Sequence, residues 1–198
     1  CSELTPGSGG PGKFRGGLGI RRRLKVLSDS AALSCLVEPS LIPPYGLCGG
    51  ASGHSMAVEV ERGSRLIDPS PVSGKVLGFP VQKGGVVELR TMGGGAYGDA
   101  VERDPEAVLE DVVEGYTTPD QAQEVYGVVT EGEHLDYEAT VEMRQELKKE
   151  RIYLRVVPTP ADDFAGGRRI ARLSPTVAAR LKVGQGGLIE IVTATSAP

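Results

Sequence analysis

The chain has 198 residues, which is enough for one domain or two small ones. Its formal net charge of −4 gives no basic field, so we expect no nucleic-acid partner. No apolar run approaches the length that spans a bilayer, so we expect no membrane partner. The three cysteines lack a metal-finger spacing and no signal peptide is visible, which indicates reduced thiols and a cytoplasmic protein.

Glycine is concentrated in the first half of the chain. Of the 28 glycines, 20 lie in the first 100 residues, which predicts turns and closely packed backbone there. Residues 1–17 are rich in Gly, Ser and Pro, but Phe14 and Arg15 among the glycines favour an ordered loop over a flexible linker. The three glycines at 93–95 mark a place where backbone passes close to more protein or to a ligand.

The first 95 residues predict several short strands joined by glycine turns. Apolar and polar residues alternate over short runs, which is typical of half-buried strands. Strands are expected at 18–27, 31–38, 56–61, 76–81 and 86–90. In the first of these runs, apolar residues lie on one face with basic residues opposite, and Arg21–Arg23 predict a solvated strand face.

The pattern becomes helical at residue 104. Asp104-Pro105-Glu106 combines an N-cap acceptor, a proline at the first helical position and an acid near the positive end of the helix dipole. The capping-box pattern at 118–121 predicts a second helix that ends at Gly127 and forms a helical hairpin with the first. A third helix is expected at 137–150, capped by Asp136.

The last segment predicts short strands again, at 152–156, 170–173 and 188–193. One short helix begins between them at Ser174-Pro175. This order predicts a small β-barrel-like appendage. The expected fold class is therefore α+β, with a β-rich glycine-turn body at 1–103, a helical segment at 104–150 that holds the hairpin plus one helix, and the appendage at 151–198.

Familiar catalytic signatures are missing from the sequence. It contains no nucleotide P-loop and no G-x-S-x-G elbow. Neither His54 nor His134 has a second ligand at metal spacing, so we expect no metal site. His54, in a loop with two serines, is open to two interpretations: a contact to an anion or substrate, or a surface turn residue. His134 is predicted to lie in a solvated loop.

Three features of the glycine loops are candidates for binding. Arg15 is suited either to bind a carboxylate or phosphate bidentately or to tie its loop to its own carbonyls. The run at Gly93 and Gly94 predicts either an anion-binding nest of N–H groups or close packing of two chain segments. Asp99 is placed to cap the turn that follows it.

Cys1 carries a free α-amine beside a thiol. This is the equipment of an N-terminal nucleophile, in which the amine serves as the base. The alternative is a processing boundary with no chemistry of its own. Catalytic residues therefore stay unassigned.

Five motifs occur in one order along residues 3 to about 150. They read GSGGPGKFRGGLG at 7–19, PYGLCGG at 44–50, GGGAYGD at 93–99, ERDPEAV at 102–108 and AQEVYGVV at 122–129. In this order they resemble the C-terminal part of the hydantoinase B/oxoprolinase family, which includes N-methylhydantoinase B, 5-oxoprolinase and the large subunits of acetone and acetophenone carboxylases. Two positions depart from the pattern: Ala96, where a fourth glycine is usual, and Ala100, where proline often follows Gly-Asp.

The resemblance implies part of an ATP-dependent enzyme. Such proteins work with a hydantoinase A-type partner that binds and hydrolyses ATP, and together they open cyclic amides or carboxylate ketones. Family members are much longer, and the metal- and substrate-binding part attributed to the carboxylases lies in their N-terminal region. The partners implied are therefore the hydantoinase A-type protein and the N-terminal hydantoinase B part. No cofactor is expected on this chain, with ATP and a divalent metal on the partner subunits.

Three functions stay open. The first is a C-terminal fragment or small subunit that completes the large catalytic subunit of a cyclic amidohydrolase or ketone carboxylase. The second is a purely structural assembly subunit, and the third is an autonomous hydrolase that uses Cys1. Candidates for substrate or interface contacts, chosen for their positions on glycine loops, are Arg15, Tyr45, His54, Gly93, Gly94, Tyr97 and Asp99.

Overall fold

The structure is a computed structural model of the chain. It describes residues 1–37, 42–62, 65–70, 74–152, 171–185 and 189. The chain divides into two compact units, of which the first includes Cys1–Lys149 and the second spans Glu150–Ile191.

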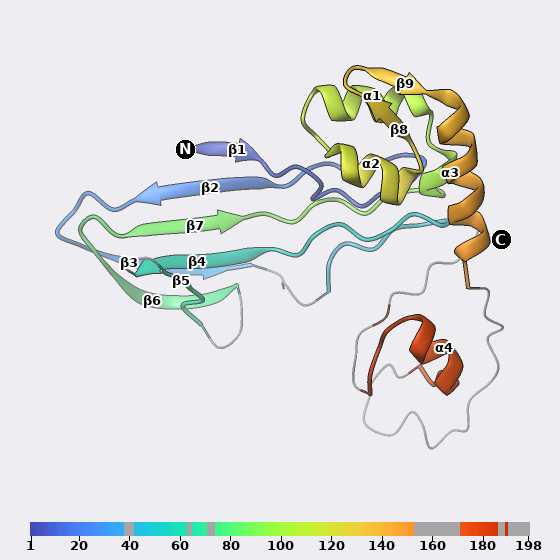
Figure 1. Ribbon diagram of the computed structural model, residues 1–198. Helices are drawn as coiled ribbons and strands as arrows, with labels where there is room; N and C mark the ends of the chain where they lie inside the picture. Colours follow the sequence, from blue (N-terminus) through green and yellow to red (C-terminus); the bar gives the residue numbers. More distant parts are fainter. Residues whose placement is uncertain (38–41, 63–64, 71–73, 153–170, 186–188, 190–198) are drawn as a thin grey trace. The chain divides into compact units, whose positions relative to one another are not determined.

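Two antiparallel sheets form the β-rich part of the first unit (Figure 1). The larger sheet has the order β1 (Ser2–Leu4), β2 (Ile20–Lys25), β7 (Val86–Arg90), β4 (Ala57–Arg62) and β5 (Arg65–Ile67). The smaller sheet pairs β3 (Ser30–Leu36) with β6 (Lys75–Gln82). The five predicted strands are confirmed to within a few residues; residue 38 lies outside the described residues. The sequence did not predict β1 and β5, which have three residues each.

The larger sheet has one apolar face and one charged face. On the apolar face, Val60 and Val87 form a core with Val81 of the smaller sheet, and Leu33 and Phe79 pack against it, so the two sheets share this core. The charged face centres on Glu88, which is buried among arginines of β2 and β7. Of the three arginines predicted to be solvated, Arg22 is exposed, whereas Arg21 and Arg23 are half-buried and paired with carboxylates.

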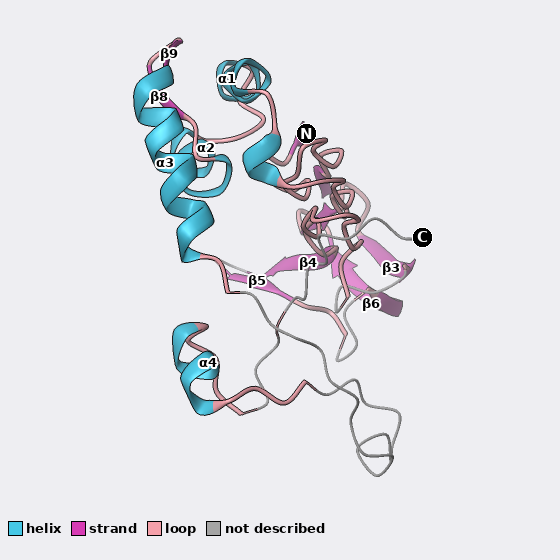
Figure 2. Cartoon of the chain, turned by 90° about the vertical axis from the view of Figure 1, so that its right-hand side faces the viewer, coloured by secondary structure: helices cyan, strands magenta, loops and turns pink. Residues whose placement is uncertain are grey.

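Three helices and a small hairpin form the helical part of the first unit (Figure 2). The helices are α1 (Pro105–Val113), α2 (Pro119–Tyr126) and α3 (Tyr137–Glu150). A short 3-10 helix, η1 (Ala100–Glu102), precedes α1, and β8 (Val129–Glu131) pairs with β9 (His134–Asp136) before α3. Neither η1 nor the β8–β9 hairpin was predicted. The core of this part consists of Val108, Ala122, Tyr126 and Val128.

The predicted helix caps are confirmed. The Asp104 carboxylate accepts a hydrogen bond from Glu106 N at 3.1 Å, and Asp136 accepts one from Ala139 N at 2.9 Å. Thr118 and Gln121 form the reciprocal capping box, and Gly127 ends α2 in the left-handed conformation. These signals are short-range, so the sequence contains all that they need.

The described residues of the second unit contain one helix, α4 (Pro175–Arg180), which begins at Ser174 as predicted. Most residues of the three predicted strands lie outside the described residues, and those that are described, 152, 171–173 and 189, are not in a strand. The predicted barrel-like appendage therefore falls mainly on residues outside the described ones. Among the described helices, none combines the length and the apolar character that crossing a membrane requires.

Candidate functional site

Three glycine-rich segments, 7–19, 44–54 and 91–99, lie together and form what we call the glycine junction. Backbone hydrogen bonds join them across long distances in sequence. Gly10 N donates to Gly94 O at 2.9 Å, and Ala96 N donates to Ala51 O at 3.0 Å. Figure 1 shows these extended segments running side by side from the ends of β2, β4 and β7 to the helical part. The junction therefore connects the sheet to the helices.

Gly93 and Gly95 occupy places that no other residue can fill. A Cβ at Gly93 would lie closer than 3.0 Å to the carbonyl of Ser8, and one at Gly95 would lie equally close to the carbonyl of Tyr45. Because the obstacle in each case is backbone, it cannot turn aside as a side chain would. The glycine run thus lets chain segments pack closely against each other, which was one of its two interpretations beside an anion-binding nest.

Two of the three backbone N–H groups of the glycine run, those of Gly93 and Gly94, are already used inside the chain. Gly93 N donates to His54 O at 3.2 Å and Gly94 N donates to Gly17 O at 2.8 Å. The three residues that follow the run, Ala96, Tyr97 and Gly98, also donate their backbone N–H groups to carbonyls of the junction. These hydrogen bonds favour packing over an anion-binding nest.

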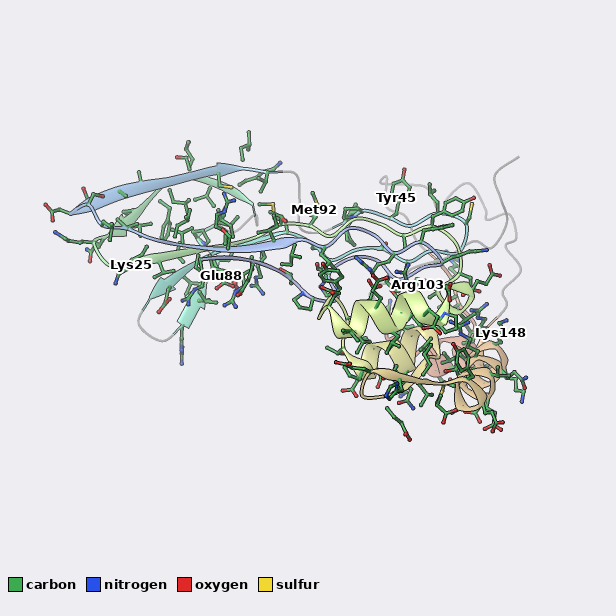
Figure 3. All side chains as sticks on the ribbon, turned by 90° about the horizontal axis from the view of Figure 1, so that it is seen from above. Lys25, Tyr45, Glu88, Met92, Arg103 and Lys148 are labelled. Carbon is green, nitrogen blue, oxygen red and sulfur yellow. The ribbon has the colours of Figure 1, made fainter. Side chains whose placement is uncertain are left out.

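Arg15 ties the junction to helix α1. Its Nε and Nη2 atoms donate to the two carboxylate oxygens of Asp111 at 2.9 and 3.0 Å, and its Nη1 atom donates to Gly16 O at 3.0 Å. Arg103 donates to the same carboxylate at 2.9 Å, and the guanidinium of Arg15 lies 5.5 Å from the ring centroid of Tyr116. Arg15 thus binds both a carboxylate and its own loop, but the carboxylate belongs to the chain itself. Figure 3 shows Arg103 between the junction and the helices.

Tyr45 and Tyr97 remain accessible to solvent. Their exposed fractions are 74% and 50%. The Tyr97 ring lies 6.3 Å from that of Phe14, centroid to centroid. A hydrogen bond with the side chain of Cys48 raises the pKa of the Tyr97 hydroxyl. These two tyrosines are therefore candidates that a partner or a ligand can reach directly.

The other candidates have mainly structural surroundings. Asp99 accepts a hydrogen bond from Val101 N at 3.1 Å and caps η1, as predicted. His54 is exposed, and its backbone N donates to Ser8 O at 2.8 Å. His134 is exposed too, but it begins strand β9 and does not lie in a loop. The α-amine of Cys1 donates to Arg23 O at 3.1 Å, and Cys1 is exposed.

The seven candidates all lie in the glycine junction, but they do not line a common cavity. The described part of the chain has a cavity of about 540 Å³ lined by 60–61 and 80–86, and one of about 280 Å³ lined by 131 and 134–138. None of the seven candidates lines either cavity. No group of three or more His, Cys, Asp or Glu side chains that is suited to a metal ion occurs among the described residues.

Sequence reasoning missed Asp111, which is the centre of the buried ion pairs. Its side chain is only 7% exposed. A signal was present, because Asp111 is three residues after Val108 and so falls on the apolar side of α1. A carboxylate at such a position needs a buried partner.

Comparison with known proteins now gives the family. The family model described as hydantoinase B/oxoprolinase matches residues 1–100. The chain belongs to the hydantoinase B/oxoprolinase family. It is 33% identical over 146 residues to the B component of a putative D-/L-hydantoinase of Pseudomonas sp. (strain NS671), a match that covers 72% of this chain and 24% of that protein.

Two further relatives of this hydantoinase B-family chain extend the comparison. The ATP-dependent caprolactamase from Pseudomonas jessenii has a solved structure that matches with a TM-score of 0.61 at 30% identity, over 73% of this chain and 25% of that one. The acetone carboxylase alpha subunit of Xanthobacter autotrophicus is 27% identical over 84% of this chain and 26% of its own length. The chain therefore spans about a quarter of the length of the relatives that it matches.

Proposed function

We propose that this chain is part of an ATP-dependent cyclic amidohydrolase or ketone carboxylase. It is either the C-terminal part of the large catalytic subunit or a separately encoded small subunit that completes that large subunit. The observation that carries the proposal is the family match of residues 1–100 together with the span of only 24% of the hydantoinase relative. The relatives are named as a hydantoinase subunit, a caprolactamase and a carboxylase subunit. The two reaction classes proposed for this chain are therefore the opening of cyclic amides and the carboxylation of ketones.

In this proposal the chain completes the fold of the large subunit. The glycine junction supports this role because it fixes loops by backbone contacts and leaves Tyr45 and Tyr97 exposed. Arg15 and Asp99 hold the junction to the helical part and shape those loops. ATP and a divalent metal belong to partner subunits, of which a hydantoinase A-type protein is the ATP-binding one.

Reconstitution tests the proposal. The chain is combined with the N-terminal hydantoinase B part and the hydantoinase A-type protein from the same genome, and ATP-dependent turnover is measured with hydantoin, 5-oxoproline, caprolactam and acetone plus bicarbonate. We expect turnover of one of these substrates only when all three components are present. Equal turnover without the chain, or no turnover and no complex with it, would overturn the proposal.

A purely structural subunit is the second candidate function. The observation that favours it is the pairing of Arg15 with Asp111, which occupies the one guanidinium that the sequence placed in a glycine loop. Tyr45→Phe and Tyr97→Phe separate the two functions in the reconstituted enzyme. If the chain is purely structural, both variants assemble and turn over at the wild-type rate. If its loops shape the shared site, at least one variant assembles normally but has an altered kcat or KM.

A further inference from the structure

The glycine junction has two faces, and helices cover one of them. On the covered face, Arg15 reaches Asp111 of α1, and Gly7 N donates to Tyr116 O at 2.8 Å. Figure 3 shows the helices on this side of the junction and Tyr45 projecting from the opposite side. The opposite side is therefore left open by the described residues of this unit.

Four large side chains, Phe14, Tyr45, Leu47 and Tyr97, define what we call the open face. Their exposed fractions are 62%, 74%, 56% and 50%. Tyr97 is bridged to both Phe14 and Leu47, and bridged residues present their side chains on the same side. Phe14, Leu47 and Tyr97 thus lie in one exposed cluster, in which the rings of Phe14 and Tyr97 are 6.3 Å apart, and Tyr45 precedes Leu47 by two residues. Aromatic residues are enriched in protein interfaces, and an exposed apolar cluster marks an interaction site.

The backbone holds this cluster in a fixed arrangement. Phe14 and Tyr97 exchange two backbone hydrogen bonds, at 2.9 and 3.0 Å, and Leu47 N donates to Ala96 O at 2.8 Å. Side chains anchored on such a backbone lose little freedom when a partner binds, which favours strong contacts. Leu36 and Leu77 are also exposed, at 85% and 93%, but they lie on the two-stranded sheet and include no aromatic ring.

Lys13 and Arg15, the two cations that flank Phe14, already have carboxylate partners within the chain. Lys13 lies 3.9 Å from Glu102, and Arg15 is bound to Asp111. A partner of this face is therefore recognised through apolar contact and shape, not through charge. The relatives indicate what this partner is. The match covers only 24% of the hydantoinase relative, so most of that protein's length has no counterpart in this chain.

We infer that the open face is the docking surface for the N-terminal hydantoinase B part, which seats an apolar segment against Phe14, Leu47 and Tyr97. The inference rests on the proposed function and adds to it the side chains that make the joint. It assigns Tyr97 to the interface and not to the reacting groups.

Binding of the tagged N-terminal hydantoinase B part to the full chain tests the inference by titration calorimetry. We expect the double variant Phe14→Ser/Leu47→Ser to weaken binding by about tenfold or more, since central apolar anchors dominate such interfaces. The matched control is Leu36→Ser/Leu77→Ser, which also removes two exposed apolar side chains and is expected to bind within about twofold of wild type. Thermal melting of each variant shows whether the fold is intact.

A second measurement needs no substitution. Cys48 lies beside Leu47 and Tyr97 in the junction, whereas Cys35 lies on the two-stranded sheet. Iodoacetamide labelling of the wild-type chain, read by mass spectrometry, should fall at Cys48 when the N-terminal part is bound and stay unchanged at Cys35.

The outcomes separate this inference from the proposed function. No binding of the N-terminal part to the wild-type chain overturns both. Binding that survives Phe14→Ser/Leu47→Ser, with Cys48 labelled as before, overturns the inference and leaves the proposed function standing. Binding lost through Leu36→Ser/Leu77→Ser alone moves the interface to the two-stranded sheet and also overturns the inference.

Discussion

At the scale of single residues, Asp111 ties the junction to the helices. Its buried carboxylate accepts two hydrogen bonds from Arg15 and one from Arg103, and the two arginine side chains are only 19% and 14% exposed. Removal of one member of a buried ion pair leaves the others charged without a partner, and this costs more than the pair contributes. Asp111 is therefore a residue whose loss the fold should tolerate poorly.

We expect Asp111→Ala to lower the free energy of unfolding by about 3–5 kcal/mol, because two guanidinium groups lose their buried partner. Urea denaturation followed by circular dichroism measures the change. The control is Asp29→Ala, which breaks the exposed pair with Lys83 and should cost less than about 1 kcal/mol. Equal losses in the two variants would show that the Arg15–Asp111 contact is not a stabilising tie.

Gly93 gives a second prediction at this scale. Because a Cβ there would overlap the carbonyl of Ser8, Gly93→Ala should destabilise the chain by about 3 kcal/mol or more. Gly17→Ala is the matched control in the same junction, since no atom lies within 4 Å of a Cβ built at Gly17. The denaturation midpoints of both variants measure the difference. If Gly93→Ala were as stable as Gly17→Ala, the backbone at Gly93 would not approach the Ser8 carbonyl so closely.

At the scale of elements, the charged face of the larger sheet depends on Glu88. The carboxylate is 3% exposed, Arg21 donates to it at 2.9 Å, and Arg23 and Arg90 lie within 3.6 Å. The hydrogen bond from Arg21, more than any other influence, lowers the pKa of Glu88 below its ordinary value of 4.5. The charged form is thus favoured in the folded sheet, where it compensates three neighbouring cations.

This lowered pKa predicts how stability changes with pH. A carboxyl whose folded pKa is depressed stabilises the fold above its unfolded pKa, and that contribution disappears as pH falls through the folded value. The difference in unfolding free energy between wild type and Glu88→Gln should therefore be larger at about pH 7 than at about pH 2.5. Urea titrations at both pH values measure it, with exposed Glu133→Gln as control. A difference independent of pH would contradict the assigned pKa direction.

Helices and strands also show which elements a sequence can predict. The caps at Asp104, Thr118 and Asp136 were predicted because donor and acceptor lie within three residues of each other. The main strands were predicted from alternation, whereas β1 and β5 are too short for a periodic pattern. The sequence left both packing and anion binding open for the glycine run. Only the fold shows that carbonyls of other segments, such as His54 O and Gly17 O, accept hydrogen bonds from its N–H groups.

The candidate site was less predictable than the fold. The sequence left two interpretations of Arg15 open, a contact to a carboxylate or phosphate and a tie to its own loop, and the structure pairs it with Asp111, 96 residues away, and with Gly16 O. Nothing local in the sequence links Arg15 to Asp111, so the sequence could not say whether the carboxylate belongs to a ligand or to the chain. The exposure of Phe14 and Leu47 likewise depends on which face the helices cover.

At the scale of the whole molecule, the question is whether the chain acts alone. An autonomous hydrolase would use the Cys1 thiol with its α-amine as base, whereas that amine donates to Arg23 O in the structure. One glycine added before Cys1 removes the free amine of the cysteine. We expect the extended chain to support the same turnover as wild type in the reconstituted enzyme. Turnover lost by this extension, while the complex still assembles, would favour the N-terminal nucleophile.

The glycine junction also sets the order in which the chain can fold. Its hydrogen bonds join residues near the start of the chain to residues near position 95, and the Arg15–Asp111 contact spans 96 residues. Contacts so distant in sequence form late, because the intervening chain must first be brought together. On a ribosome, residues 7–19 must wait for the synthesis of the segment around Gly93 before they find their hydrogen-bond partners. Until shortly before then the larger sheet also lacks its central strand β7, so β2 and β4 have neither this pairing partner nor the junction, and unpaired strand edges of this kind favour misfolding.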